Sequence, residues 1–186
     1  MPFHHTDFEG LVVFEPRIFN DERGYFYESY NEQTFNAAGV SAKFVQDNQA
    51  RSTYGVLRGL HYQVGANAQA KLVRVVQGRV LDVVVDLRPN SATFGRSYSI
   101  ELTDSNHLQL FVPRSFAHGY VVLSETAEFV YKCDNFYSKA DEGGLFYADP
   151  ALKIDWKIDL REAIVSEKDL ILPNFGAHRP FEAQLS

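Results

Sequence analysis

The amino-acid sequence predicts an all-β sandwich or barrel, and three observations lead to this fold class. Short runs rich in β-branched and aromatic residues recur along the chain, and turn-forming residues separate many of them. The 15 Phe and 10 Tyr are many for 186 residues, and aromatic side chains at that density favour a β-rich interior. No helical segment is long enough to organise the fold. Many short strands at this spacing are typical of a sandwich or barrel.

The first four expected strands lie in the N-terminal third of the chain. They are LVVFEP at 11–16, YFYESY at 25–30, KFVQDN at 43–48 and YGVLRGLHYQ at 54–63.

The next pair of strands, 71–77 (KLVRVVQ) and 79–87 (RVLDVVVDL), is separated by the turn residues Gln77-Gly78. Turn sequences at RPNSATFG and TDSN then separate the strands that follow. The remaining strands are expected at 97–102 (SYSIEL), 107–113 (HLQLFVP), 119–124 (GYVVLS) and 128–134 (EFVYKCD).

Two short helices are expected beside the strands. The stretch NEQTFNAAG predicts a helix that begins after Asn31 as N-cap and ends at Gly39. A further short helical turn is expected near residues 161–170, and the last residues, EAQLS, are expected to form a frayed tail.

The composition predicts one domain that spans residues 1–186. A chain of this length buries about 70% of its unfolded surface in a single core. The one cysteine, Cys133, excludes an internal disulfide and fits a reducing compartment. The N-terminal MPFHHTDFEG lacks the features of a signal peptide, and no segment has the 18 or so apolar residues of a membrane span. We therefore expect a cytoplasmic protein with no membrane contact.

The formal net charge of −6 argues against a broad nucleic-acid-binding surface. A small anionic ligand can still be held by a few focused basic residues. Arg23 and Arg58 are candidates, because a guanidinium group binds oxyanions through two parallel hydrogen bonds.

The expected strand 54–63 carries Arg58 and His61 among apolar neighbours, which is costly unless both side chains have polar partners. The strand therefore lies at a sheet edge or lines a polar cavity. Residues three apart point to opposite faces of a regular strand. A bulge at Gly59 would bring Arg58 and His61 to the same side.

Two pairs of residues are candidates for acid and base chemistry. If residues 54–77 form a hairpin centred near residue 66, His61 and Lys71 lie opposite each other with Cβ atoms roughly 5 Å apart. The alternative is a core histidine and a solvated edge lysine. A second hairpin that turns near Glu125 would bring His118 close to Tyr131; the alternative is a tyrosine that only packs.

The stretch VSEKDL at 165–170 permits two interpretations. Ser166 followed by Asp169 matches a capping box at a helix N-terminus. Alternatively, Asp169 orients a histidine and fixes its tautomer. Dinucleotide and P-loop glycine motifs are absent from the sequence. The six histidines are scattered without an HxH or HExxH pair, so no metal site is expected.

Six stretches lie in collinear order: FNDERGYFYESYNEQTF, FVQDNQARSTYGVLRGLHYQ, KLVRVVQGRVLDVVVDLRPNSATFG, FVPRSFAHGY, YKCDNFY and SEKD. Together they resemble the dTDP-4-dehydrorhamnose 3,5-epimerase family, and the likeness covers roughly residues 8–175. The resemblance implies an all-β, cupin-type jelly-roll sandwich with a few short peripheral helices, a homodimer, and neither metal nor cofactor. It also implies a dTDP-linked 4-keto-6-deoxy sugar as substrate, inverted at C3 and C5 on the route to dTDP-L-rhamnose.

The resemblance also implies roles for individual residues. His61 would be the base with Asp169 as its partner, Tyr131 the acid on the opposite face, and Lys71 the group that stabilises the enolate oxygen. Arg23, Phe26 and Glu28 would reach into the partner subunit's pocket. Nucleotide and sugar contacts are implied for Arg23, Phe26, Glu28, Gln46, Asn48, Arg58, His118, Tyr137, Glu142 and Lys168.

Three rival functions remain at this stage. A single-centre epimerase of a dTDP-4-keto-6-deoxy sugar would share nearly every residue named above, and product stereochemistry would separate the two. A metal-dependent cupin oxygenase or isomerase would contain stoichiometric metal. A non-catalytic nucleotide-sugar-binding jelly roll would need no base, oxyanion stabiliser or acid, so the presence of His61, Lys71, Tyr131 and Asp169 together argues against it.

Overall fold

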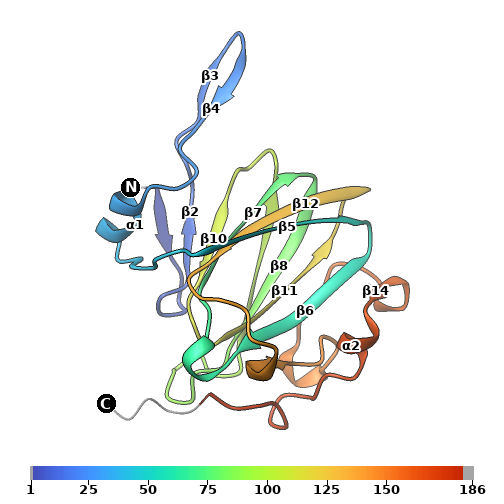
Figure 1. Cartoon of the computed structure of the whole chain (residues 1–186). Coiled ribbons are helices and arrows are strands. Elements are labelled where there is room, and N and C mark those ends of the chain that lie inside the picture. Colours follow the sequence, from blue (N-terminus) through green and yellow to red (C-terminus); the bar gives the residue numbers. More distant parts are fainter. Residues whose placement is uncertain (1, 182–186) are drawn as a thin grey trace.

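Two β-sheets pack face to face in the computed structural model of the chain, which describes residues 2–181 (Figure 1). The first sheet contains, in spatial order, β1 (Phe3–His5), β2 (Val12–Phe14), β10 (Gln109–Val112), β7 (Lys71–Gln77), β12 (Thr126–Cys133) and β5 (Gln46–Thr53). The second contains β13 (Glu142–Gly144), β6 (Val56–Gln63), β11 (Phe116–Val122), β8 (Arg79–Asp86) and β9 (Ser97–Thr103), with β14 (Ile164–Val165) beside β6.

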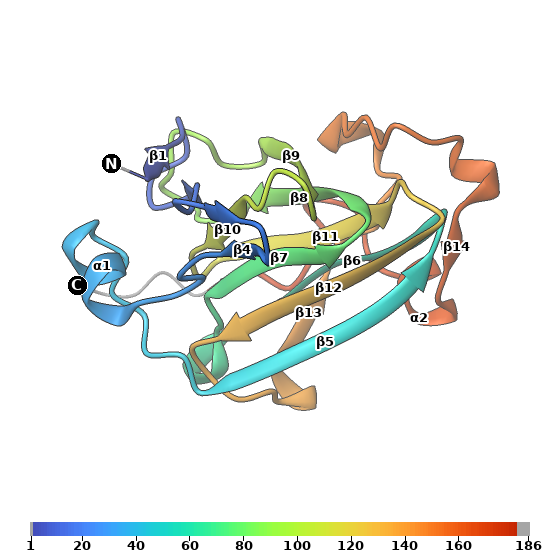
Figure 2. The same cartoon turned by 90° about the horizontal axis from the view of Figure 1, so that it is seen from above.

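The remaining elements surround this sandwich. A hairpin of β3 (Phe19–Asp21) and β4 (Gly24–Phe26) projects away from it (Figure 1). The helices α1 (Glu32–Ala37) and α2 (Glu167–Leu170) lie at opposite ends of the sandwich (Figure 2). Short 3₁₀ turns cover Gly65–Asn67, Lys139–Asp141, Pro150–Leu152 and Leu160–Glu162.

Three apolar clusters hold the layers together. Val73 and Phe129 of the first sheet pack with Val84 of the second in the interior between the sheets. The chain after β13 covers the outer face of the second sheet, where Trp156 is buried. Phe35 of α1 packs on the outer face of the first sheet near β2. The interior between the sheets is therefore closed by apolar packing along only part of its length.

The expected strands are present, with differences at their ends. Only the first residues of YFYESY are in a strand, and β5 begins at Gln46 and continues to Thr53. The sequence reasoning missed β1, β3, β13 and β14, which are too short for a periodic pattern. It also missed most of β5, because this edge strand carries polar side chains on both faces.

The helix predicted after Asn31 is confirmed. The Asn31 side chain accepts hydrogen bonds from the backbone N–H groups of Gln33 (3.0 Å) and Thr34 (3.3 Å). Gly39 follows the helix with φ +84°, a conformation that glycine adopts without steric cost. The second expected helical region contains the 3₁₀ turn Leu160–Glu162, β14 and α2 in succession. The tail EAQLS lies outside the described residues.

Both predicted hairpins are wrong. β6 and β7 belong to different sheets, and so do β11 and β12. Each connection crosses from one sheet to the other, so the joined strands face each other across the interior instead of sharing a hydrogen-bond ladder. His61 and Lys71, and likewise His118 and Tyr131, therefore meet across a cavity.

Among residues 2–181, no helix combines the length and the apolar character that crossing a bilayer requires.

Candidate active site

The candidate site is a cavity of 510 Å³ between the two sheets. An adjoining pocket of 340 Å³ shares His61, Lys71 and Tyr131 with it. The 510 Å³ cavity is lined by residues of β6, β11 and β12, by Ala50 of β5, by Lys71 at the start of β7, and by residues 164–166, 168 and 169. The adjoining pocket adds Gln46, Asn48, Gln63, Cys133, Tyr137 and Glu142.

An irregularity at Gly59 brings Arg58 and His61 into the same cavity, as the bulge hypothesis predicted. His61 pairs with His118 of β11 and Arg58 pairs with Tyr120, so three steps along β6 match two along β11. Gly59 has φ +118°, and a Cβ atom there would lie 2.6 Å from the Gly119 Cα atom. Only glycine fits this position.

Asp169 is buried and bonds directly to His61. Its Oδ1 atom lies 2.6 Å from Nε2 of His61, and its Oδ2 atom accepts a hydrogen bond from the Gly59 backbone N–H at 3.2 Å. Burial alone would raise the pKa of Asp169, but the hydrogen bonds from His61, Gly59 and Ser166 hold it below its usual value. The carboxylate is therefore ionised beside the imidazole.

Both interpretations of VSEKDL hold at once. The Ser166 hydroxyl accepts a hydrogen bond from the Asp169 backbone N–H at 3.2 Å, which caps α2. The Asp169 side chain meanwhile orients His61. Because an ionised carboxylate only accepts, Nε2 of His61 carries the hydrogen, and in the neutral imidazole Nδ1 then keeps a lone pair. The His61–Asp169 dyad can thus offer Nδ1 as a proton acceptor.

Tyr131 and Lys71 come from the opposite sheet. The Lys71 Nζ atom lies 5.9 Å from the centre of the Tyr131 ring. Burial raises the pKa of Tyr131, so its phenol keeps its proton in the resting site. Burial lowers the pKa of Lys71, and the nearby Cys133, Asp82 and Glu142 oppose that shift. The cavity thus holds a base on one sheet and a protonated phenol and an amine on the other.

Arg58 and His118 extend the polar lining. The Arg58 guanidinium donates to the Ser52 hydroxyl at 3.4 Å and 3.3 Å, a neutral partner that leaves its charge available to an anion. The His118 Nε2 atom lies 2.9 Å from Oδ2 of Asp82, which is fully buried.

The sequence reasoning missed Asp82 and Tyr120. In the described part of the chain, Asp82 Oδ1 and Tyr120 Oη are buried without a hydrogen-bond partner. A signal for Asp82 was present, because it interrupts a valine-rich strand where an unpaired charge is costly. No comparable signal marked Tyr120, whose ring stacks on Phe129 with ring centres 4.2 Å apart.

Other predicted contacts line the adjoining pocket, and Lys168 lines the 510 Å³ cavity. The Gln46 side chain donates to Asn48 Oδ1 at 3.1 Å. Lys168 bonds Glu142 at 2.6 Å and 2.7 Å, which links α2 to the pocket edge. Tyr137 is 57% exposed at the rim.

Arg23, Phe26 and Glu28 do not line this cavity. Arg23 and Phe26 lie on the projecting β3–β4 hairpin, where Phe26 is 71% exposed and Arg23 pairs with Asp21. Glu28 follows the hairpin and accepts a hydrogen bond from Asn31 at 3.1 Å. These predicted contacts therefore lie apart from the other site residues of their own chain.

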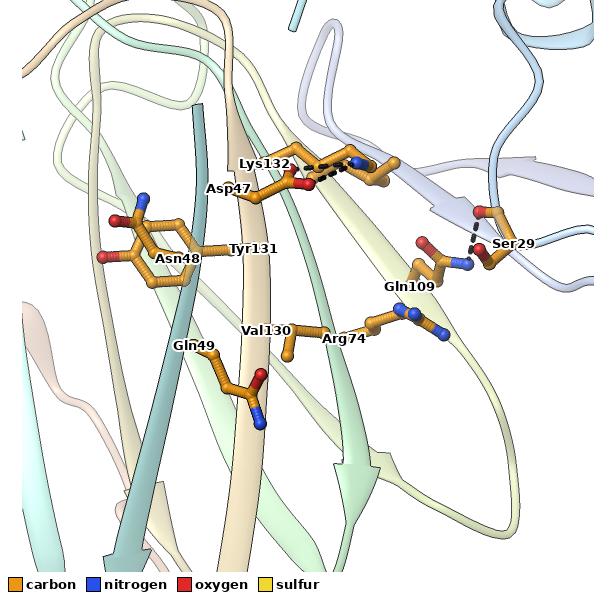
Figure 3. A pocket seen from close by; sticks show the side chains of 10 residues that line it. Ser29, Asp47, Asn48, Gln49, Arg74, Gln109, Val130, Tyr131 and Lys132 are labelled. Carbon is orange, nitrogen blue, oxygen red and sulfur yellow. Dashed lines mark hydrogen bonds and ion pairs between the residues drawn. The ribbon is translucent and has the colours of Figure 1, made fainter. Parts of the chain in front are cut away.

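Another pocket, of 330 Å³, lies on the outer face of the first sheet (Figure 3). Tyr131 and Asn48 point to the opposite side of β12 and β5 from Lys132 and Asp47, as pleating requires. The Lys132 amine bonds Asp47 at 2.9 Å. This pocket holds no histidine, so the interior cavity is the better candidate for proton transfer.

Among the described residues 2–181, no three or more His, Cys, Asp or Glu side chains are grouped as metal ligands would be.

The chain is similar to known proteins over nearly its whole length. The sequence profile of the dTDP-4-dehydrorhamnose 3,5-epimerase family matches residues 5–177. The dTDP-4-dehydrorhamnose 3,5-epimerase of Pseudomonas aeruginosa is 52% identical over 161 residues, which cover 86% of this chain and 87% of that protein.

Solved structures of such epimerases are also similar to this chain. The dTDP-4-dehydrorhamnose 3,5-epimerase of Elizabethkingia anophelis superposes with a TM-score of 0.90 at 55% identity, covering 94% of this chain and 96% of that one. A dTDP-6-deoxy-D-glucose-3,5-epimerase of Legionella pneumophila, in complex with dTDP-4-keto-L-rhamnose, superposes with a TM-score of 0.91 at 40% identity, covering 97% and 98%. The expected cupin-type fold is confirmed, and the chain belongs to the dTDP-4-dehydrorhamnose 3,5-epimerase family.

Proposed function

We propose that this protein inverts C3 and C5 of dTDP-4-keto-6-deoxy-D-glucose by proton transfer through an enolate, in dTDP-L-rhamnose biosynthesis. The observation that carries the proposal is the convergence of the His61–Asp169 dyad, Lys71 and Tyr131 on one cavity, in a chain of this family.

The His61 imidazole removes the proton. Both C3 and C5 are adjacent to the C4 ketone, so each carries a proton that the carbonyl acidifies. The C–H electron pair moves toward the carbonyl, and negative charge develops on the C4 oxygen. One base therefore serves both carbons if the ring turns between steps. Asp169 stabilises the imidazolium that forms.

Lys71 stabilises the enolate oxygen. In its protonated form, which the nearby Asp82 and Glu142 favour against the effect of burial, the Lys71 amine acts where negative charge develops, and it is already in place before the reaction. Tyr131 then returns a proton to the carbon from the face opposite His61, which inverts the centre. A positioned general acid or base contributes about 10² to 10⁴ in rate, or roughly 3 to 5 kcal/mol of the barrier.

The C4 ketone itself accepts the electron pair, so this chemistry requires no metal and no redox cofactor. Recognition of the substrate falls to the polar residues around the reacting centre. Arg58 pairs with the diphosphate in this proposal, and Gln46, Asn48, His118, Tyr137, Glu142 and Lys168 contact the nucleotide or the sugar. The unpaired Cys133 fits a reducing compartment, and we propose a cytoplasmic enzyme.

The wild-type protein, incubated with the 4-keto sugar nucleotide in D₂O, should incorporate solvent deuterium at both C3 and C5, followed by NMR. Both protons are adjacent to one ketone and are removed by one base. Deuterium at one carbon only, with a product inverted at that carbon, would identify a single-centre epimerase instead. No incorporation and no binding of dTDP would overturn the proposed function.

We also propose a homodimer in which the hairpin completes the partner's site. The support is the β3–β4 hairpin, which projects away from the sandwich (Figure 1) and carries Arg23 and Phe26, neither of which lines the cavity of its own chain. A 71% exposed phenylalanine on a projecting arm is expected to be covered in the assembled protein.

Mixing two inactive variants tests this arrangement. His61→Ala removes the base of its own cavity, and Arg23→Ala removes the arginine of its own hairpin. In a mixed dimer, the Arg23→Ala cavity receives an intact hairpin from its partner, so co-expression should restore about one quarter of wild-type activity. Light scattering should give twice the monomer mass of 21.1 kDa. A monomer at micromolar concentration, or no restoration, would contradict the shared site.

A further inference from the structure

The side chain of Gln63 ties the wall of the cavity to its rim. Gln63 is the last residue of β6, two positions after His61, and its side chain is 5% exposed. Its Nε2 atom donates to the backbone carbonyls of Asn67 at 2.7 Å and Phe136 at 3.1 Å. Its Oε1 atom accepts from the backbone N–H of Ser138 at 2.6 Å.

These bonds hold the backbone on both sides of Tyr137. The segment from Phe136 to Ser138 belongs to no strand, so no sheet ladder fixes it. The buried amide of Gln63 supplies an acceptor and a donor in place of a neighbouring strand. Tyr137 itself is 57% exposed and lines the pocket beside the catalytic cavity, so Gln63 bonds the backbone on either side of a tyrosine at the rim.

Other polar side chains connect the same two loops. The Asn67 amide donates to Asp141 Oδ2 at 2.6 Å, and the Ser138 hydroxyl donates to the same oxygen at 2.7 Å. The Asn135 amide donates to the Ala66 carbonyl at 2.8 Å. The loops thus remain joined if one bond is lost. Asn135 Oδ1 also accepts from the Phe136 backbone N–H at 2.9 Å, whereas the Phe136 carbonyl and the Ser138 N–H are bonded by Gln63.

We propose that Gln63 is a positioning residue that fixes Tyr137 at the rim, and that it thereby sets the affinity for the nucleotide-sugar without a part in proton transfer. The inference rests on the proposed function. A fixed, flat aromatic ring at the rim stacks on a base or packs on a sugar at low entropic cost. A ring on a loose loop loses that advantage.

The test is a double-mutant cycle with steady-state kinetics and calorimetric titration of dTDP. Gln63→Leu should raise KM and weaken dTDP binding by roughly 10-fold, the size of one lost stacking contact, with kcat close to wild type. Tyr137→Ala should do the same. In the Tyr137→Ala background, Gln63→Leu should add little, because the ring through which Gln63 acts is gone.

Two further variants serve as controls. Asn67→Ala removes the bond to Asp141 between the same loops but leaves the Gln63 contacts, because Gln63 bonds the backbone carbonyl of Asn67. This variant should leave KM unchanged. Gln63→Glu keeps the acceptor for the Ser138 N–H and loses the donor to the two carbonyls, so it should raise KM. If Gln63→Leu does not fold, the KM of Gln63→Glu tests the positioning role in its place.

A fall in kcat at constant KM, full additivity with Tyr137→Ala, or an equal effect of Asn67→Ala would overturn the positioning role. Wild-type protein that neither exchanges deuterium nor binds dTDP would instead overturn the proposed function. The two failures are therefore distinguishable.

Discussion

Replacing His61 by alanine should abolish deuterium exchange at C3 and C5 together with turnover. The substitution removes the base that the buried Asp169 orients, and Nε2 of His61 lies 2.6 Å from that carboxylate. The expected loss is at least the 10² to 10⁴ that a positioned base supplies. NMR of the sugar nucleotide in D₂O measures both carbons in one experiment. Dimer formation should persist, because the substitution lies in the cavity.

Asp169→Asn tests the other member of the His61–Asp169 dyad. The amide keeps the size of the side chain but loses the charge that stabilises the imidazolium. The rate of deuterium exchange should fall by an equal factor at C3 and at C5, because both carbons use the same dyad. The matched control is His4→Ala, which removes a histidine that is 57% exposed on β1 and should leave exchange at the wild-type rate. Exchange that persists at one carbon in His61→Ala would assign that carbon to a different base.

Tyr131→Phe should separate inversion from exchange. The substitution keeps the aromatic ring and its packing beside Phe129, whose centre lies 6.0 Å away, and deletes the hydroxyl. His61 can still form the enolate and return a proton from its own side. Inversion should fall by about 10² to 10⁴ while exchange falls much less, provided that water does not replace the phenol. The measurement compares the rate of deuterium incorporation with the rate of product formation.

Tyr120→Phe is the matched control for this experiment. Tyr120 lines the same cavity, stacks on Phe129 and carries a buried hydroxyl, so it is the nearest alternative donor. The proposed mechanism requires that Tyr120→Phe keep the wild-type ratio of inversion to exchange. If Tyr131→Phe inverts normally, or if its exchange and inversion fall together, Tyr131 is not the opposite-face donor. Tyr120 and then Tyr137 become the candidates.

Local patterns in the sequence determined several parts of this protein. The valine-rich runs at β7 and β8 and the Asn31 cap of α1 depend on residues a few positions apart, and each is confirmed. The Gly59 irregularity was also deduced locally, because Arg58 and His61 could share a side only if the strand lost its regular alternation. The ordered family motifs likewise placed His61, Lys71, Tyr131 and Asp169 among the site residues.

Tertiary structure alone decided which segments meet. The expected hairpins were wrong because strands joined by short connections cross between the sheets, and sheet membership depends on packing between segments far apart in sequence. The polar strand β5 is stable because β12 pairs with it along its whole length. Asp82 and Gln63 matter through partners 36 and 75 residues away. Propensity acts over a few residues, whereas a cavity between sheets is defined by how the sheets pack. The sequence therefore predicted which residues carry the chemistry, but not which strands bring them together.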